Sequence, residues 1–212
     1  VRQVHMLVIG ESASKRCFGL YGYDRQTTPL MERMPGVMTF EDATSGATST
    51  ILAVPHMITN TAPGQVLEAT RQPSVLTAYK RAGYRVYWLS TQRKHGTFDT
   101  LTSLFAEDAD EAVFQGGNFD LYGAGAYGGA SDKELLPLVR SILARNDPKA
   151  LIVLHTIGSH GPYPARYSPK AARFPVDARA AMSALFRIAA PGAVASPEDL
   201  RLAQDAYDNS IC

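Results

Sequence analysis

Short apolar segments alternate with amphipathic ones along this chain, and this alternation constrains the fold more than any other feature of the sequence. Apolar runs at 4–9, 84–89 and 150–155 have the length of β-strands. Segments with the apolar spacing of helices lie between them, at 73–82 and 131–144. Because strands that alternate with helices favour a parallel sheet, we expect an α/β fold with a mostly parallel central sheet and helices on both faces.

The remaining segments complete this expected pattern. The apolar run at 37–40 predicts another strand, and a helix is expected to begin near Ala47 or Thr48 and to continue through Ile58. A last helix is expected at 197–211. Two segments rich in small residues are interpreted as loops or insertions, the Gly-rich one at 116–129 and the Pro- and Ala-rich one at 161–196.

Length and charge exclude some classes of protein. A chain of 212 residues fits one large α/β domain, or most of one. Its 21 Lys and Arg residues balance 20 Asp and Glu residues, so the net charge of +1 gives no electrostatic basis for binding nucleic acid. No apolar run approaches the ~20 residues that cross a bilayer. Two cysteines, Cys17 and Cys212, are too few for a disulfide framework.

Polar residues follow three of the predicted strands. Glu11 comes after the first strand, and the segments 90–94 and 156–160 follow two others. Ligands of parallel sheets gather beyond the carboxyl ends of the strands, so these residues are candidates for a site. A carboxylate at this place could bind a metal ion, and the alternative is an acidic loop residue in solvent.

Thr48 lies within a cluster of small and hydroxylic residues at 44–50, before a predicted helix. Backbone N–H groups at a helix start attract anions such as phosphate. A threonine hydroxyl needs a base or a metal ion to act as a nucleophile. The alternative interpretation is that Thr48 is an ordinary N-cap.

Two of the histidines flank the segment 155–160. His155 ends an apolar run and is expected to be buried and hydrogen-bonded, whereas His160 lies beyond small residues and is better placed to meet a substrate. His56 lies inside the helix after Thr48 and is interpreted as structural.

Five motifs, in this order, resemble those of the phosphoethanolamine transferase branch of the alkaline phosphatase and sulfatase superfamily. They are Val-Ile-Gly-Glu-Ser at 8–12, Leu-Tyr-Gly-Tyr-Asp-Arg-Gln-Thr-Thr-Pro at 20–29, Ala-Thr-Ser-Gly-Ala-Thr-Ser-Thr at 43–50, His-Thr-Ile-Gly-Ser-His-Gly-Pro at 155–162 and Tyr-Asp-Asn-Ser-Ile at 207–211. The resemblance spans nearly the whole chain and implies the fold of that superfamily.

The resemblance also implies a reaction. Glu11 would be a zinc ligand, and Thr48 would both contact the zinc and receive phosphoethanolamine from phosphatidylethanolamine, giving a covalent phosphothreonine-type intermediate. Lipopolysaccharide, at lipid A or the core, would then accept the group at the periplasmic face of the inner membrane. His160 would contact the transferred phosphate or a second metal, Gln92 would bind substrate, and Lys94 would neutralise phosphate charge.

The chain also departs from the family pattern. Gly46 and His56 stand where many relatives have cysteines, so the bridge that those cysteines form is missing here. Arg16 and Cys17 stand where relatives often have an acid and a histidine. The family's Asp-His zinc ligands lie beyond the last motif. We therefore expect residues 1–212 to be the N-terminal part of a catalytic domain, with the membrane anchor and the C-terminal metal-ligand segment outside them.

Two alternatives stay open. The chain could be another hydrolase of this superfamily or a phosphoglycerol transferase, although the Cys/Ser-x-Pro-Ser-Arg run of a formylglycine sulfatase does not occur in it. It could also be a catalytically incomplete, truncated chain. The transfer reaction implied by the resemblance, and the residues assigned to it, require that Glu11 and Thr48 share one divalent cation.

Overall fold

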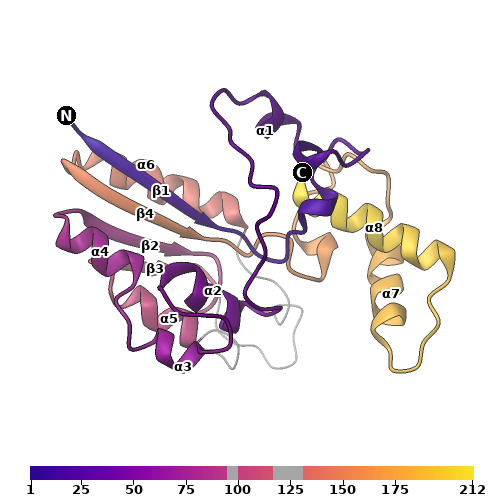
Figure 1. Ribbon diagram of the computed structural model, residues 1–212. Helices are drawn as coiled ribbons and strands as arrows, with labels where there is room; N and C mark the ends of the chain where they lie inside the picture. The colour runs from indigo at the N-terminus through magenta and orange to yellow at the C-terminus, as the bar shows by residue number, and fades with distance from the viewer. Residues whose placement is uncertain (95–99, 117–130) are drawn as a thin grey trace. The chain divides into compact units, whose positions relative to one another are not determined.

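Residues 1–94, 100–116 and 131–212 are described by a computed structural model (Figure 1). The Gly-rich segment predicted to be a loop therefore lies outside the described residues, apart from Gly116, as does His95.

The chain divides into two compact units, and each unit is built from two separate stretches of sequence. The sheet unit comprises Val1–Gly10 and Thr44–Ile157. The helical unit comprises Glu11–Ala43 and Gly158–Cys212. The chain therefore leaves the sheet unit after its first strand, returns to it, and leaves it again after its last strand.

The sheet unit contains a four-stranded sheet in which the strands follow the order β1-β4-β2-β3. The strands are β1 (Gln3–Ile9), β2 (Arg85–Ser90), β3 (Glu111–Phe114) and β4 (Lys149–His155). Every pairing is parallel, and the register sets Gln3 opposite Lys149 and Arg85 opposite Ala150. The parallel sheet predicted from the alternation of elements is confirmed.

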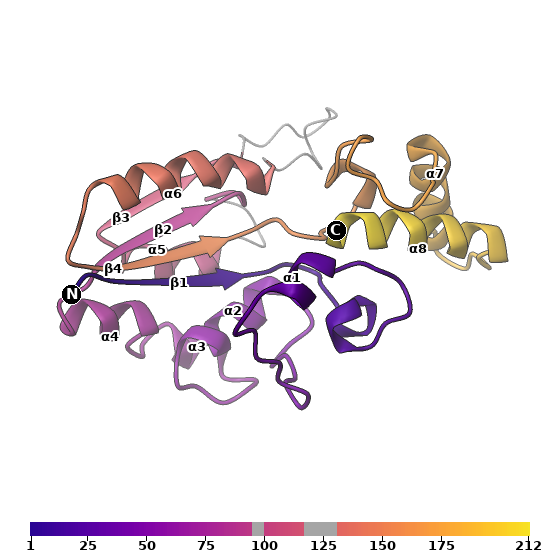
Figure 2. The ribbon, with the colours of Figure 1, turned by 90° about the horizontal axis from the view of Figure 1, so that it is seen from above.

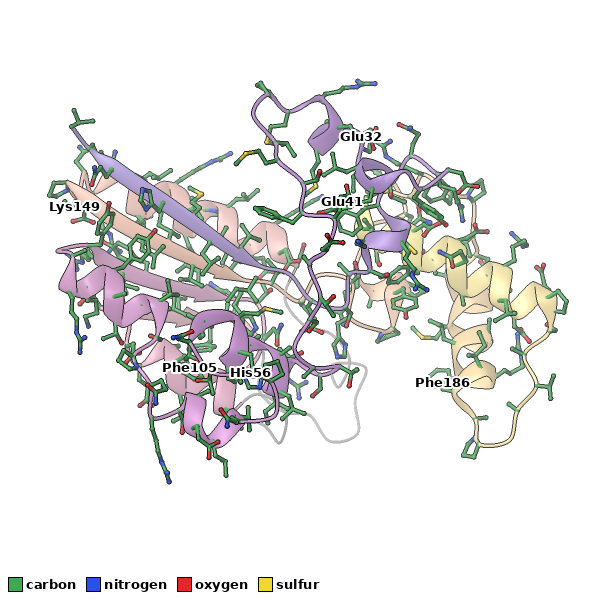
Figure 3. All side chains as sticks on the ribbon, in the orientation of Figure 1. Glu32, Glu41, His56, Phe105, Lys149 and Phe186 are labelled. Atoms are coloured by element: carbon green, nitrogen blue, oxygen red, sulfur yellow. The ribbon has the colours of Figure 1, made fainter. Side chains whose placement is uncertain are left out.

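Helices cover both faces of this sheet, as expected (Figure 2). One face is covered by α2 (Thr50–Ile58), α3 (Val66–Ala69), α4 (Val75–Arg81) and α5 (Thr100–Ala106), and the other by η4 (Asp132–Glu134) and α6 (Leu135–Ala144). Successive residues of a strand point to opposite faces. Val86 and Trp88 accordingly join the buried cluster of the first face, whereas Tyr87 and Leu89 join that of the second. Phe105 of α5 lies in the first cluster, near α2 (Figure 3).

The helical unit contains short helices and two longer ones, α7 and α8, that pack against each other. Its elements are η1 (Lys15–Cys17), η2 (Gly19–Tyr21), α1 (Pro29–Arg33), η5 (Tyr163–Ala165), α7 (Ala178–Ala189) and α8 (Pro197–Ile211). The last helix begins with a capping box between Ser196 and Asp199. The carboxylate of Asp199 also forms an ion pair of 2.5 Å with Arg187 of α7, so the same residue caps one helix and joins it to the other.

Two predictions about elements are wrong. Residues 37–40 form no strand, and Met38 and Phe40 are 81% and 70% exposed, because an apolar run becomes a strand only where a partner strand or a core covers it. The segment 161–196 is not only loop, since it contains η5 and the twelve-residue α7. That helix is capped by Asp177, whose carboxylate accepts a hydrogen bond from the N–H of Ala180 at 2.8 Å.

The other predicted elements occur close to their predicted bounds. The helix predicted at 73–82 is α4, and the one predicted at 131–144 is η4 followed by α6. Both cysteines are free. None of the helices in the described ranges has the length and apolar character needed to cross a membrane.

Candidate active site

Glu11 opens the helical unit, directly after the strand β1 and Gly10. Its half-buried side chain accepts a hydrogen bond from the Ser12 hydroxyl at 2.8 Å. Its backbone carbonyl accepts one from the N–H of Ser159 at 3.0 Å. Gly158 has a φ of +49°, and a Cβ there would come within 2.7 Å of the Glu11 carbonyl oxygen. Only glycine satisfies both conditions, so the segment 158–159 fixes the main chain of the candidate metal ligand.

The loop after Glu11 carries backbone strain. Ser12 has a φ of 53°, in the left-handed region, which costs a residue other than glycine about 1 kcal/mol. The phenol of Tyr207 holds this loop on both sides: its hydroxyl donates to the Ser12 carbonyl at 2.9 Å and accepts from the N–H of Ser14 at 2.8 Å. Strain of this kind persists where the surroundings hold it, and Tyr207 supplies that hold.

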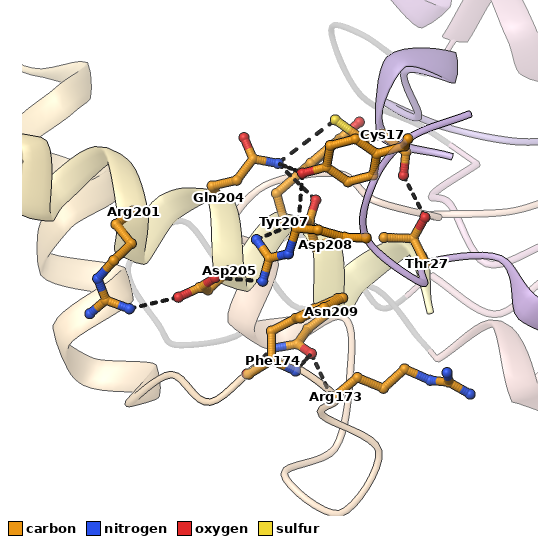
Figure 4. A network of polar contacts seen from close by, with 12 residues as sticks. Cys17, Thr27, Arg173, Phe174, Arg201, Gln204, Asp205, Tyr207, Asp208 and Asn209 are labelled. Atoms are coloured by element: carbon orange, nitrogen blue, oxygen red, sulfur yellow. Dashed lines mark hydrogen bonds and ion pairs between the residues drawn. The ribbon is translucent and has the colours of Figure 1, made fainter. Parts of the chain in front are cut away.

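Four consecutive residues near the end of α8 each hold a different stretch of the helical unit. Figure 4 shows Asp208 and Asn209, among them, within their network of polar contacts. Tyr207 holds the loop after Glu11. Asp208 forms an ion pair of 2.7 Å with Arg25, and Asn209 accepts hydrogen bonds at 2.7 and 2.9 Å from the N–H groups of residues 173 and 174. The carbonyl of Ser210 accepts a 3.4 Å hydrogen bond from Ser159. The motif at 207–211 is therefore a structural anchor, which motif order alone did not indicate.

Asp208 is fully buried, and two of its partners, Tyr23 and Arg25, come from the motif at 20–29. It accepts hydrogen bonds from the Tyr23 hydroxyl at 3.0 Å and from Gln204 at 2.7 Å, in addition to the Arg25 ion pair. Burial, followed by the hydrogen bond to Asp208, raises the pKa of Tyr23 to about 12. Burial also raises the pKa of Asp208, against the opposing effects of Gln204, Tyr23 and Arg25. At neutral pH the phenol therefore stays a hydrogen-bond donor in this network.

Thr48 lies in the sheet unit, exposed, two residues before α2 begins. The helix starts later than predicted, and its N-cap is Ser49, whose carbonyl accepts hydrogen bonds from the N–H groups of residues 52 and 53 at 3.1 and 2.8 Å. The N-cap interpretation of Thr48 is therefore wrong. Its hydroxyl stands on the exposed loop that leads into a helix start, which leaves a chemical role open to it.

Gly46 and His56 lie against each other beside this loop. A Cβ built on Gly46 would lie 3.4 Å from the Cβ of His56, close to the spacing of about 3.5–4.5 Å that a disulfide needs. The ring atom Nδ1 of His56 is buried and has no hydrogen-bond partner among the described residues. The structural interpretation of His56 fits this packing, which occupies the place where the resemblance sets a cysteine bridge.

Gln92 and Lys94 follow β2 in the sheet unit. Gln92 is only 7% exposed, and its side-chain amide donates to the Thr156 carbonyl at 2.7 Å. A Cβ on Gly116 would come within 2.5 Å of the Gln92 backbone, so this turn is packed tightly. Gln92 thus braces the ends of β2 and β4 against each other, whereas Lys94 is exposed.

The two histidines at 155–160 have the environments expected of them. His155 is 3% exposed, and its Nδ1 lies 3.1 Å from the Ser90 hydroxyl. His160 is exposed in the helical unit, where its Nδ1 lies 2.7 Å from the carbonyl of Gly161 and its own carbonyl accepts from Arg166. Glu11 and the 158–160 segment are thus brought together in the helical unit, while Thr48, Gln92 and Lys94 belong to the sheet unit.

Zinc requires more donors than the described residues bring together. Zinc in proteins is bound by three or four ligands, most often His, Cys, Asp or Glu. Nowhere in residues 1–94, 100–116 and 131–212 do three such side chains come together in a group that could hold a metal ion. The described part of the chain therefore supplies at most a fraction of a zinc site, and Glu11 is its candidate donor.

Comparison with known proteins identifies the family. The family model described as Sulfatase matches residues 3–211. This chain belongs to the sulfatase family. Within the family's range of activities, the phosphoethanolamine transferase CptA of Salmonella typhimurium is 27% identical over 173 residues, which are 80% of this chain and 29% of CptA. The phosphatidylethanolamine transferase Mcr-1 of Escherichia coli is 31% identical over 174 residues, 80% of this chain and 31% of Mcr-1.

The fold of this sulfatase-family chain also has a solved counterpart. The C-terminal periplasmic domain of EcEptC from Escherichia coli, in complex with Zn, matches it with a TM-score of 0.78 and 25% identity, over 99% of this chain and 56% of that domain. The resemblance to the phosphoethanolamine transferases and the superfamily fold predicted from the motifs are both confirmed. The chain spans about a third of the curated relatives' length and about half of the solved domain.

Sequence reasoning missed the residues that hold the candidate site in place. Tyr207, Asp208 and Arg25 were noted only as parts of motifs. A signal was present: acidic residues recur at 199, 205 and 208, among the apolar positions of the last helix. Charged residues are almost never buried without partners, so acids on the inner face of a helix predict a buried ionic network.

Proposed function

We propose that this chain is the N-terminal part of the catalytic domain of a phosphoethanolamine transferase, with Thr48 as nucleophile. The observation that carries the proposal is the family match over 3–211, together with similarity to named phosphoethanolamine transferases. The exposed position of the Thr48 hydroxyl before α2 supports it, because a phosphoryl group approaching there would meet the N–H groups of a helix start.

The proposed reaction consists of two displacements at phosphorus. In the first, the Thr48 Oγ forms a bond to the phosphorus of phosphatidylethanolamine, the bond to the diacylglycerol oxygen breaks, and the threonine proton is in effect passed to that oxygen. In the second, an oxygen of the lipopolysaccharide acceptor bonds to phosphorus. The bond to Thr48 then breaks, and the threonine hydroxyl regains a proton.

Zinc is the proposed cofactor, with Glu11 as one ligand and the remaining ligands outside these 212 residues. The Zn complex of the similar Escherichia coli domain supports this choice. When bound, zinc acts as a Lewis acid that makes a coordinated hydroxyl more acidic and polarises a phosphoryl oxygen. The carboxylate of Glu11 is half-buried and its main chain is fixed, as a ligand requires.

Three further residues are proposed to contact the substrate. His160 is exposed, and because its Nδ1 lies on the Gly161 carbonyl, Nε2 is the nitrogen that can reach a phosphoryl oxygen. Lys94 is exposed and offers a positive charge for the same group. Gln92 is proposed as a substrate-binding residue after β2, where the hydrogen bond from its side-chain amide to the Thr156 carbonyl fixes its place.

The proposed setting is the periplasmic face of a bacterial inner membrane, where the lipid donor lies. A membrane anchor would come from polypeptide outside these 212 residues. The similar domain of EcEptC is named as a C-terminal periplasmic domain, which supports this placement.

The test is incubation of the full-length protein, which would carry the remaining zinc ligands, with labelled phosphatidylethanolamine and zinc, followed by intact-mass analysis. We expect a phosphoethanolamine adduct on Thr48, no adduct with Thr48→Ala, and a reduced adduct with Thr48→Ser, which keeps a hydroxyl. An adduct that persists in Thr48→Ala would disprove the assignment of the nucleophile. Transfer of the label to lipopolysaccharide rather than to water separates a transferase from a hydrolase.

A second candidate is a catalytically incomplete chain. It is favoured by one observation, the absence of a three-ligand metal group among the described residues. In this case the wild type forms no adduct at any zinc concentration. The same mass measurement therefore decides between the two candidates.

A further inference from the structure

The loop that follows Glu11 is held by a residue almost 200 positions away in the sequence. The hydroxyl of Tyr207 donates a hydrogen bond of 2.9 Å to the Ser12 carbonyl and accepts one of 2.8 Å from the Ser14 N–H. One phenol thus holds both ends of a three-residue loop. The Ser12 hydroxyl in turn donates to Glu11 Oε1 at 2.8 Å. Two hydrogen bonds, one to the carbonyl and one from the hydroxyl of Ser12, therefore connect Tyr207 with the carboxylate of Glu11.

Tyr207 itself is held firmly. It lies on the well-formed helix α8, and its ring packs edge-on against the ring of Tyr163, with 4.9 Å between the ring centres. The two neighbours that follow it, Asp208 and Asn209, are 0% and 2% exposed and anchor the same turn of the helix. The phenol is therefore a fixed point from which a loop can be positioned.

The strain at Ser12 explains why such a fixed point is needed. With a φ of 53° this serine sits in a backbone region that residues other than glycine avoid, and without external contacts it would relax to an extended or helical conformation. Relaxation of Ser12 would rotate the peptide group next to Glu11 and remove the Ser12 hydroxyl from its carboxylate. Gly158 and Ser159 hold the main chain of Glu11 from the other side.

We propose that Tyr207 is a positioning residue, which keeps the Glu11 carboxylate in one orientation by holding Ser12 and Ser14. This inference rests on the proposed function in that Glu11 is taken as the metal ligand. Residues that orient a metal ligand typically change metal affinity by about 10- to 100-fold when they are replaced. Because the Tyr207 hydroxyl bonds to Ser12 and Ser14, its effect on metal binding would pass through this loop to Glu11.

The first test compares Tyr207→Phe with wild type and with the matched control Tyr163→Phe. Both variants lose one hydroxyl and keep the packed ring pair. The Tyr163 hydroxyl, unlike that of Tyr207, forms no hydrogen bond with any of the described residues. In Tyr207→Phe we expect the Ser14 amide to exchange with solvent roughly tenfold faster, because its acceptor is gone. In protein labelled with ¹³C-carboxyl glutamate, the Glu11 signal should shift or broaden.

The control Tyr163→Phe should leave both signals as in wild type, and Glu11→Gln identifies the Glu11 carboxyl signal by removing it. A Tyr207→Phe protein that is folded, with an unchanged Ser14 amide and an unchanged Glu11 carboxyl signal, would overturn the positioning role. This test needs neither zinc nor activity.

The second test is a zinc titration of the same variants in the full-length protein, which would carry the remaining proposed ligands. We expect Tyr207→Phe to weaken zinc binding about 10- to 100-fold and Glu11→Gln to weaken it at least as much. Equal affinity in Tyr207→Phe and wild type, with loss in Glu11→Gln, would again overturn the positioning role. If Glu11→Gln binds zinc like wild type, or wild type binds none, the ligand assignment in the proposed function fails, and the Glu11 carboxyl signal alone decides whether Tyr207 holds that side chain.

Discussion

The interactions that stabilise the sheet unit differ in kind from those that stabilise the helical unit. In the sheet unit the buried residues are mainly large and apolar, among them Trp88, Leu89 and Ile152, each 0% exposed. In the helical unit, buried apolar residues are few and mostly alanines, and buried polar residues such as Asp208 and Asn209 take their place. The sheet unit thus depends on the area it removes from water, and the helical unit on directional contacts.

This difference has a functional side. Apolar packing tolerates small displacements of side chains, whereas a buried ionic network keeps its energy only in one geometry. The unit that carries Glu11 is the one built from directional contacts. A candidate metal ligand, which must be placed to within a fraction of an ångström, is therefore supported by the kind of interaction that specifies position most strongly.

The largest effect is expected from a variant that disrupts the apolar packing of the sheet unit. Leu89→Ala removes a fully buried side chain from the cluster under α6 and should lower the free energy of unfolding by about 3 kcal/mol, measured by urea denaturation followed by circular dichroism. Leu136→Ala, at a leucine of α6 that is 52% exposed, is the matched control and should change it little. Equal losses in both variants would mean that burial does not govern the stability of this unit.

The next variant disrupts the buried polar network of the helical unit. Asp208→Ala removes the acceptor of Tyr23 and Gln204 and one of the two carboxylates paired with Arg25, and should cost about 2 kcal/mol. Arg25 keeps its partner Asp205 at 2.7 Å, which limits the loss. Thermal unfolding with far-UV circular dichroism measures it. A loss no larger than that of an exposed Asp24→Asn control would contradict a stabilising network.

A third change strengthens the sheet unit beside Thr48. The pair Gly46→Cys and His56→Cys should form a disulfide under oxidising conditions, because the two Cβ positions are close to disulfide spacing. We expect a gain of about 1 to 2 kcal/mol over the reduced form. Mass spectrometry with and without reductant, beside each single variant, measures bond formation. Failure of the two thiols to join would contradict the packing of the loop against α2.

The smallest effect is a pH dependence in the helical unit. Hydrogen bonds from Arg187 and then Ser196 lower the pKa of Asp199 from 3.8 to about 2. Because the folded-state pKa lies below the unfolded one, the stabilisation is present above the unfolded value and is lost as the pH falls through the folded value. Asp199→Asn should thus have a lower Tm than wild type at pH 6, and the difference should shrink between about pH 4 and pH 2. A difference that is constant with pH would mean that the charge of Asp199 does not matter.

The elements of the sheet unit could largely be predicted from the sequence, because local pattern decides them. Strands such as β4 are continuous apolar runs of strand length, and helices such as α6 repeat apolar residues at helical spacing. The run at 37–40 has the same local pattern without a covering partner, and pattern alone could not tell the two apart. The helix α7 was missed because alanines, rather than large apolar residues, occupy its buried positions, Ala181 and Ala184.

The candidate site was predictable only in part. Motif order located Glu11, Thr48 and His160, but the side chains that hold Glu11 come from far along the chain. Arg25 and Asp205 are 180 residues apart and meet at 2.7 Å. A contact of this kind leaves no periodic trace in a single sequence, whereas strands and helices do.

The order of the strands in the sheet has a consequence for biosynthesis. Of the four strands of this sheet, β1 is made before the others, and in the finished sheet it pairs with β4. About 145 residues are translated between them, which at 5–20 residues per second takes roughly 7 to 30 seconds. Throughout this interval β1 lacks its neighbour, and both its backbone hydrogen-bonding groups and the Ile9 side chain, which is 4% exposed in the finished fold, are open to other chains. Chaperone protection during translation should therefore raise the yield of folded protein.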